Sequence, residues 1–130
     1  MSESNEPLFQ FDQVTVVRGG APILTVVSCQ LAAGTTAIVG PSGAGKSSLL
    51  RLLNRLTDPA AGTIRFRGTN VRALDVLQLR RGVALVPQLP ALLPGTVEDN
   101  LRYPAELAQR RVDMPAVLCR SGLDESFSPR

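Results

Sequence analysis

The fold is decided by the stretch Gly40-Pro41-Ser42-Gly43-Ala44-Gly45-Lys46-Ser47-Ser48, which fits G-x-x-x-x-G-K-[S/T] at every fixed position. An apolar, β-prone run at 36–39 precedes it, and residues 48–56 after it carry leucines at helical spacing. Strand, glycine-rich loop and helix form the context that a phosphate-binding loop requires. The sequence therefore predicts a cradle for the phosphates of a nucleotide.

The residue types of this stretch explain how it would bind phosphate. Its glycines let the backbone N–H groups approach a polyphosphate closely, and the helix that starts near Gly45 adds further N–H donors. Lys46 is the only lysine among the 14 Lys and Arg residues, so an ammonium is kept where a planar guanidinium has the wrong shape. Lys46 is expected to reach the terminal phosphates, and the Ser47 hydroxyl to bind Mg²⁺. The alternative is a glycine-rich turn that binds nothing.

Composition restricts the class of protein. A chain of 130 residues with 44% apolar and 19% charged residues suits one globular domain. Its net charge of +3 comes from scattered arginines, and with few aromatic residues it predicts no nucleic-acid surface. There is no histidine, and the isolated Cys29 and Cys119 are predicted to be buried and reduced. The polar start lacks the features of a secretory signal, and no apolar run reaches the roughly 18 residues of a membrane span, which predicts a cytosolic location.

Hydrophobic periodicity and turn residues predict the other elements. After a disordered tail at 1–7, strands are expected at 8–17, 23–31, 63–68 and 83–88, with a short helix at 75–81. Thr96-Val97-Glu98-Asp99 resembles a capping box, and the helix that it starts is expected to be interrupted at Tyr103-Pro104. Asp113-Met114-Pro115 indicates a second helix start, and Gly122 its end.

The order of these motifs resembles the ATP-binding subunits of ABC transporters. The specific features are Val86-Pro87-Gln88 and the later stretch Pro94-Gly95-Thr96-Val97-Glu98-Asp99-Asn100-Leu101. The resemblance implies an incomplete α/β fold: a P-loop NTPase core of ABC type, with an antiparallel β lobe and the start of a helical subdomain. The partial ATP-binding domain at 8–130 would comprise the lobe at 8–36 and 63–68, the P-loop core at 37–57, the Q-loop strand at 83–88, and the helical subdomain from 96 to 130.

The resemblance to ABC transporter subunits also implies which residues form the nucleotide site. Gly40 to Ser48 correspond to the Walker A loop, and Gln88 corresponds to the Q-loop glutamine, whose amide oxygen would contact Mg²⁺ or a water. ATP and Mg²⁺ are thus the expected cofactors, with Ser47 and Gln88 as metal ligands. The alternative for Gln88 is a solvent-facing polar residue at a strand end, because its position after an apolar strand says little by itself.

Two features depart from the family. Arg18 stands where members usually place an aromatic residue that stacks on adenine; its guanidinium plane can also stack, and a plain surface arginine is the alternative. The later motifs are missing: there is no Leu-Ser-Gly-Gly-Gln signature, no apolar run ending in Asp-Glu, and no switch histidine. Ser121-Gly122-Leu123-Asp124-Glu125 resembles the segment that leads into the signature, so the chain is expected to be an N-terminal half that is poorly soluble and catalytically inactive alone.

The function that the resemblance implies is an ATP-binding subunit that couples ATP binding and hydrolysis to solute transport. Its partners would be a transmembrane permease subunit and a second ATP-binding subunit, which places it peripherally on the cytoplasmic face of a membrane. The alternatives are a non-hydrolysing nucleotide-binding fragment, a soluble ABC-type ATPase outside transport, and a small-molecule kinase; a kinase does not account for Val86-Pro87-Gln88.

Overall fold

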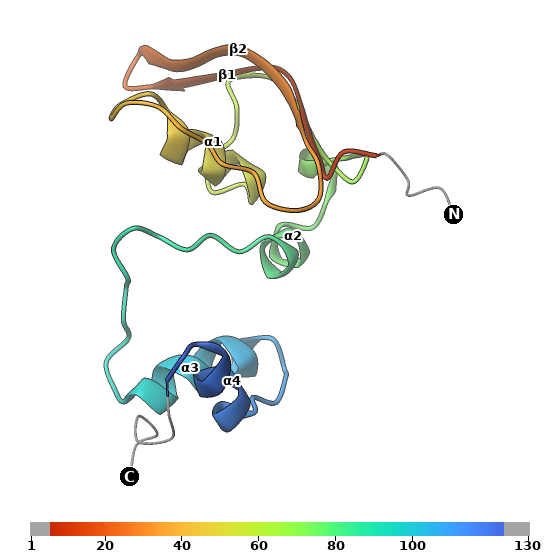
Figure 1. The fold of residues 1–130 in the computed structure, drawn as a ribbon. Coiled ribbons are helices and arrows are strands. Elements are labelled where there is room, and N and C mark those ends of the chain that lie inside the picture. The colour runs from red at the N-terminus through yellow and green to blue at the C-terminus, as the bar shows by residue number, and fades with distance from the viewer. Residues whose placement is uncertain (1–5, 124–130) are drawn as a thin grey trace. The chain divides into compact units, whose positions relative to one another are not determined.

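The computed structural model describes residues 6–123 and divides the chain into two compact units, Met1–Val86 and Pro87–Arg130. Figure 1 shows both units. The first unit contains, in order, β1 (Phe9–Arg18), β2 (Ala21–Leu31), α1 (Lys46–Leu53), β3 (Ala61–Phe66), β4 (Thr69–Asn70), the 3₁₀ helix η1 (Val71–Ala73) and α2 (Val76–Gly82). The second contains α3 (Val97–Leu107) and α4 (Met114–Arg120).

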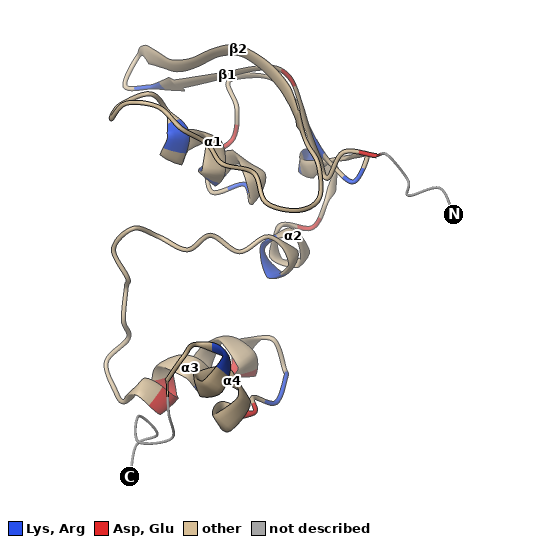
Figure 2. Ribbon diagram, in the orientation of Figure 1, with Lys and Arg blue, Asp and Glu red and all other residues tan. Residues whose placement is uncertain are grey.

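An antiparallel sheet with strand order β2-β1-β3-β4 forms one layer of the first unit. The β1–β2 hairpin closes on Gly19 and Gly20, whose φ angles of 58° and 80° suit a two-residue turn that side chains disfavour. The strands predicted at 8–17, 23–31 and 63–68 are confirmed within a few residues at each end. Lys and Arg are spread over several elements of this unit (Figure 2).

A β-bulge at Gln13 keeps β1 in phase with the core. Phe11 and Val14 are three residues apart, so a regular strand would place them on opposite faces. The register of β1 shifts against β2 between these two residues and against β3 between Asp12 and Thr15, and Gln13 has a φ of 49°. The Gln13 N–H donates to Ser28 Oγ at 2.9 Å, and a Cβ at Gly62 would collide with the Gln13 backbone. The extra residue therefore lets Phe11 and Val14 both point into the core.

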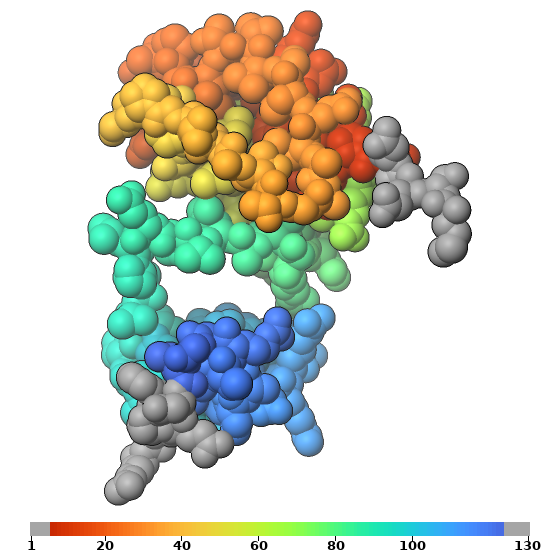
Figure 3. Space-filling model, in the orientation of Figure 1, coloured from red at the N-terminus to blue at the C-terminus, as the bar shows by residue number. Residues whose placement is uncertain are grey.

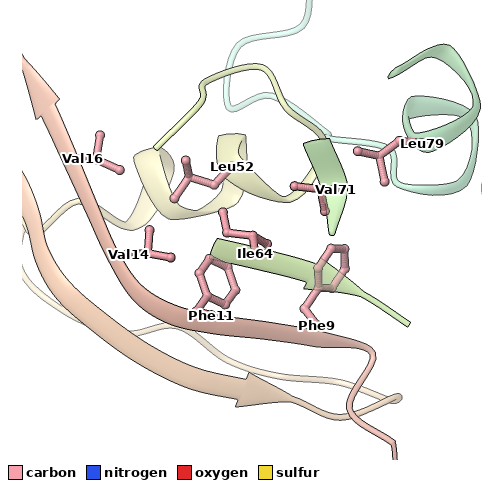
Figure 4. Close-up of a cluster of buried hydrophobic side chains, with 8 residues drawn as sticks. All are labelled: Phe9, Phe11, Val14, Val16, Leu52, Ile64, Val71 and Leu79. Carbon is pink, nitrogen blue, oxygen red and sulfur yellow. The ribbon is translucent and has the colours of Figure 1, made fainter. Parts of the chain in front are cut away.

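The core of the first unit lies between the sheet and α1. Its buried side chains come from four different elements and from η1 (Figure 4), namely Phe9, Phe11, Val14, Val16, Leu52, Ile64, Val71 and Leu79. Leu52 of α1 and Val14 of β1 are fully buried. Burial of one such side chain contributes about 1.5–3 kcal/mol. This packing fixes α1, and with it the loop that leads into α1.

In the second unit, both helices begin with side-chain caps. The Thr96 hydroxyl accepts from the Asp99 N–H at 3.1 Å, and Asp99 Oδ2 accepts from the Thr96 N–H at 2.8 Å, which confirms the predicted capping box. Asp113 caps α4. This helix ends at Arg120, and the predicted stop signal Gly122 follows it in a left-handed conformation, with the N–H of Leu123 donating to the Leu118 carbonyl across that glycine.

The prediction of strands at 36–39 and 83–88 is wrong. Neither segment forms helix or strand, and Val39 and Val86 are 88% and 89% exposed. A strand needs a neighbour for its backbone hydrogen bonds, and the sheet in residues 6–123 pairs with neither segment. Apolar composition alone is therefore insufficient to make these segments strands.

Two smaller expectations are also wrong. Pro104 does not interrupt the third α-helix, since α3 continues through it to Leu107 and the Pro104 carbonyl still accepts from the Ala108 N–H at 3.1 Å. Cys119 is exposed, whereas Cys29 is partly buried, and this burial raises the pKa of the Cys29 thiol. Residues 1–5 of the predicted tail, and 124–130 of the predicted helical subdomain, lie outside the described residues.

None of the helices found in residues 6–123 has the length and apolarity needed to span a membrane.

Candidate nucleotide-binding site

The loop from Gly40 to Gly45 depends on backbone shapes that favour glycine. Gly43 and Gly45 have φ angles of 83° and 85°, in the left-handed region. At Gly45 a Cβ would also lie 2.7 Å from Leu24 Cδ2 and 3.2 Å from the Ile23 carbonyl oxygen. The loop therefore passes close to β2 at Gly45, and only glycine fits there. Figure 3 shows the segment before α1, in orange and yellow, at the surface of the first unit.

Helix α1 begins at this loop without a side-chain cap. Its N-cap residue is Gly45, and its first turn contains no acidic residue. The N–H groups of Lys46, Ser47 and Ser48 belong to that first turn, where an α-helix has no internal acceptors for its donors. Together with the positive end of the helix dipole, these donors form an arrangement suited to an anion.

The Lys46 ammonium lies over the start of the same loop. Its Nζ donates to the carbonyl oxygens of Gly40 and Pro41, both at 2.7 Å. The loop is closed on itself by a further bond from the Ala44 N–H to the Pro41 carbonyl at 3.3 Å. The ammonium and the N–H groups at the start of α1 thus come from adjacent residues, and the whole set consists of donors. Such a set fits a polyphosphate.

The opposite end of α1 is held by one arginine, Arg80. Arg80 of α2 donates from Nε to the Asn54 carbonyl at 3.1 Å and from Nη2 to the Arg55 carbonyl at 2.7 Å. A cation at a helix C-terminus satisfies its last carbonyls and complements the dipole. Leu52, the second-last residue of the helix, is fully buried in the core. These contacts hold α1 without involving its N-terminus.

Arg18 lies at the end of β1 and is exposed. It lines a cavity of about 420 Å³ that Ser48 also lines. The structure therefore brings together two of the predicted site residues, one from the hairpin and one from the start of α1. Arg51, which lines the same cavity, was not predicted. It follows Ser48 by three residues and so shares its helix face, which is the signal that could have identified it.

Gln88 belongs to the second unit and is exposed in a segment without helix or strand. Its role beside the phosphates therefore stays a prediction. Ser47 is exposed at the start of α1, where its hydroxyl could bind a metal ion next to a phosphate. Among residues 6–123, no group of three or more His, Cys, Asp or Glu side chains is placed to hold a metal by itself.

The chain matches one protein family, and two relatives described below bear names that agree with that family. The ABC transporter family matches residues 24–127. "ABC transporter I family member 17" of Arabidopsis thaliana is 37% identical over 131 residues, covering 97% of this chain and 50% of the relative. "Probable iron export ATP-binding protein FetA" of Escherichia coli (strain K12) is 38% identical over 116 residues, covering 88% of this chain and 51% of the relative. The chain spans about half the length of these two relatives.

A solved structure extends the similarity to three dimensions. It is described as "Structure of a bacterial Atm1-family ABC exporter with ATP bound", and it matches with a TM-score of 0.70 and 40% sequence identity. The match covers 76% of this chain and 18% of that one. The predicted fold class, an incomplete ABC-type α/β core with an antiparallel lobe, is confirmed by this match and by the sheet described above.

Proposed function

Because the chain belongs to the ABC transporter family, we propose that it forms the nucleotide-binding part of a subunit that couples ATP binding and hydrolysis to solute transport across a membrane. The observation that carries this proposal is the donor set at the start of α1. The helix has no side-chain cap, and Lys46 Nζ lies within 2.7 Å of the loop carbonyls of Gly40 and Pro41. The relatives supply the connection to transport, since one is named a member of an ABC transporter family and the other an iron export ATP-binding protein.

In this proposal each part of the loop has a separate task. The backbone N–H groups from Gly43 to Ser48 bind the phosphate oxygens, and Lys46 exchanges its loop carbonyls for the terminal phosphates. Ser47 Oγ and Gln88 would hold Mg²⁺, which neutralises charge on the phosphates when bound. Arg18 lies beside the nucleoside. Phosphoryl transfer mainly requires that the phosphates are positioned and that their charge is stabilised. The loop would hold the phosphates in place, and its N–H groups and Lys46 would offset their negative charge.

The proposed partners follow from the family. A transmembrane permease subunit would bind the ATP-binding subunit on the cytoplasmic face of the membrane, and a second ATP-binding subunit would form a dimer with it. One of the relatives is named an exporter of iron, and the matching solved structure is an exporter.

Hydrolysis needs a group that orients or deprotonates the attacking water. The 130 residues contain no histidine and no apolar run that ends in Asp-Glu. We therefore expect this polypeptide alone to bind ATP without turning it over. Steady release of phosphate that disappears in Lys46→Ala would contradict this expectation.

The metal part of the proposal is tested by measuring ATP binding with and without Mg²⁺. We expect Mg²⁺ to strengthen ATP binding to the unmodified chain and to have little effect on Ser47→Ala. Ser47→Thr keeps the hydroxyl and should restore the response to Mg²⁺. An equal response in the unmodified chain and in Ser47→Ala would show that Ser47 is not a metal ligand.

A further inference from the structure

The turn that follows α1 has a strained residue where helices usually place glycine. Arg55 has a φ of 54°, in the left-handed region, and stands one residue after the C-cap Asn54. The N–H of Leu56 donates to the Arg51 carbonyl at 2.9 Å, and the N–H of Arg55 donates to the Leu52 carbonyl at 3.3 Å. This pair of bonds is a Schellman motif, in which the left-handed position favours glycine. Because a side chain at that position costs free energy, the turn depends on contacts with the surrounding protein.

The guanidinium of Arg80 supplies two of these contacts. It donates from Nε to the Asn54 carbonyl at 3.1 Å and from Nη2 to the Arg55 carbonyl at 2.7 Å. Asn54 is only 5% exposed, so its carbonyl depends on a partner within the protein. Arg55 Nη1 donates in turn to the Val71 carbonyl of η1 at 3.4 Å. One side chain of α2 therefore binds both carbonyls at the end of α1, including that of the strained residue.

Helix α1 connects this turn directly to the phosphate loop. It has eight residues, from Lys46 to Leu53, which corresponds to a length of about 12 Å. Its first turn is closed by the bond from the Leu49 N–H to the Gly45 carbonyl at 2.9 Å. A helix this short moves as one body, and a hydrogen bond weakens steeply when its geometry changes. Phosphate that fixes the start of α1 would therefore also fix the carbonyls to which Arg80 donates.

Helix α2 depends on this connection for its own stability. It has seven residues, which is too short for a helix to be stable by itself. Its one buried residue, Leu79, belongs to the same cluster as Leu52 and Val71 (Figure 4). It is also the last helix or strand of the first unit, and the segment after it continues along the chain to Gln88. Besides the packing of Leu79, the bonds of Arg80 are what attach α2 to α1.

From these contacts we propose that Arg80 is a positioning residue that couples the phosphate loop to α2, so that nucleotide bound at the start of α1 stabilises α2 through the far end of α1. The inference rests on the proposed function, because it requires the phosphates to be bound by the loop at Gly40 to Ser48. Coupling between two sites is reciprocal, so Arg80 also strengthens nucleotide binding. Helix α2 would then respond to nucleotide by a route that does not involve Gln88.

The test is hydrogen exchange of single backbone amides, measured by NMR on the 130-residue chain with and without saturating Mg-ATP. The Leu49 N–H reports on the first turn of α1, and the Val83 N–H, which donates to the Leu79 carbonyl at 2.8 Å, reports on the turn of α2 that contains Arg80. ATP should slow exchange at both amides, and at Val83 by about fivefold or more, the lower end of the range for coupling between sites. In Arg80→Gln, ATP should still slow exchange at Leu49 but no longer at Val83. A purely structural role for Arg80 would give no response to ATP at Val83 in the unmodified chain.

A matched control is Arg81→Gln, which changes the next arginine of α2. Within residues 6–123, no hydrogen bond joins the Arg81 side chain to α1, so this variant should keep the response at Val83. Calorimetry should find that Arg80→Gln binds ATP about fivefold or more weakly than the unmodified chain, and that Arg81→Gln binds it equally well. If Arg80→Gln does not fold, Arg80→Lys takes its place; it keeps the charge but not the paired donors, and should reduce the response.

Two results would overturn the coupling while leaving the proposed function intact. One is an unmodified chain that binds ATP without slower exchange at Val83, and the other is an undiminished response at Val83 in the Arg80 variant. An unmodified chain that does not bind ATP would overturn the proposed function, and this inference with it.

Discussion

Helices α1 and α3 are stabilised in opposite ways. Helix α1 has a fully buried residue, Leu52, and starts without a side-chain cap, whereas α3 has no buried residue and starts with a complete capping box at Thr96 and Asp99. At the start of α3, the N–H groups of Thr96 and Asp99 are both satisfied by side chains of the capping box. In α1 the core and Arg80 stabilise the helix, and the donors at its N-terminus are left to an external anion. On this difference we base the proposal that the start of α1, and not that of α3, binds an anion.

The largest expected effect concerns the packing of α1. Leu52→Ala should lower the free energy of unfolding by about 2–5 kcal/mol, because it leaves a cavity in the core. The matched change in α3 is Leu107→Ala, where the side chain is 61% exposed, and it should cost less than about 0.5 kcal/mol. Urea unfolding of both variants measures the difference. Equal losses would show that packing does not separate the two helices.

The second-largest effect is expected at Gly45, the N-cap residue of α1. Gly45→Ala should weaken nucleotide binding about tenfold or more, since a left-handed residue with a Cβ costs about 1–2 kcal/mol before any contact is counted. Its Cβ also meets Leu24 and Ile23. Gly68→Ala is the control, because Gly68 has a φ of 76° but no atom within 4 Å of an added Cβ. Titration calorimetry should find unchanged nucleotide affinity in Gly68→Ala; unchanged affinity in Gly45→Ala would contradict the loop geometry.

A smaller effect is expected at the cap of α3. Thr96→Ala removes the hydroxyl that accepts from the Asp99 N–H, and it should cost about 1 kcal/mol of helix stability. Thr96→Ser keeps an oxygen in the same place and should retain the stability. Helix content by circular dichroism during urea unfolding compares the three proteins. No difference between Ala and Ser at this position would mean that the capping box contributes nothing measurable.

The smallest effect is a dependence on pH. Hydrogen bonds from the Thr96 N–H and hydroxyl hold the pKa of Asp99 below its ordinary value of 3.8. Because the folded state lowers this pKa, the carboxylate stabilises α3 at pH values above the ordinary value, and the contribution is lost as pH falls through the lowered pKa. A carboxyl NMR titration should find the Asp99 midpoint below 3.8. Removing the hydroxyl in Thr96→Ala should move the midpoint upward, and a midpoint at or above 3.8 in the unmodified chain would be contrary to the prediction.

Local signals in the sequence predict α1, the capping box of α3 and the β1–β2 hairpin, because short-range chemistry determines each. The hairpin depends on Gly19 and Gly20, and the cap on Thr96 and Asp99. The prediction of strands at 36–39 and 83–88 is wrong because a strand needs a neighbouring strand for its backbone hydrogen bonds. The sequence of a short segment does not specify that neighbour. Val14 and Val39 are the same residue type, yet one is fully buried and the other is 88% exposed.

The candidate site also contains residues that local sequence predicts and residues whose place depends on segments far apart in the chain. The glycine and lysine pattern predicted the loop from Gly40 to Ser48, and the structure places Lys46 over the carbonyls at its start. Arg51 was missed because its importance depends on the cavity that it shares with Arg18, and β1 and α1 are brought together only by folding. Gln88 stays a prediction, since it belongs to the second unit.

Calorimetric titration of the folded chain with a magnesium nucleoside triphosphate tests the central claim most directly. The claim is that the start of α1 and Lys46 bind the phosphates, so the unmodified chain should bind ATP. Lys46→Ala should bind it about tenfold or more weakly, since each lost 1.4 kcal/mol is one factor of ten. Equal affinity in the two proteins, or no heat of binding in the unmodified chain, would contradict the account.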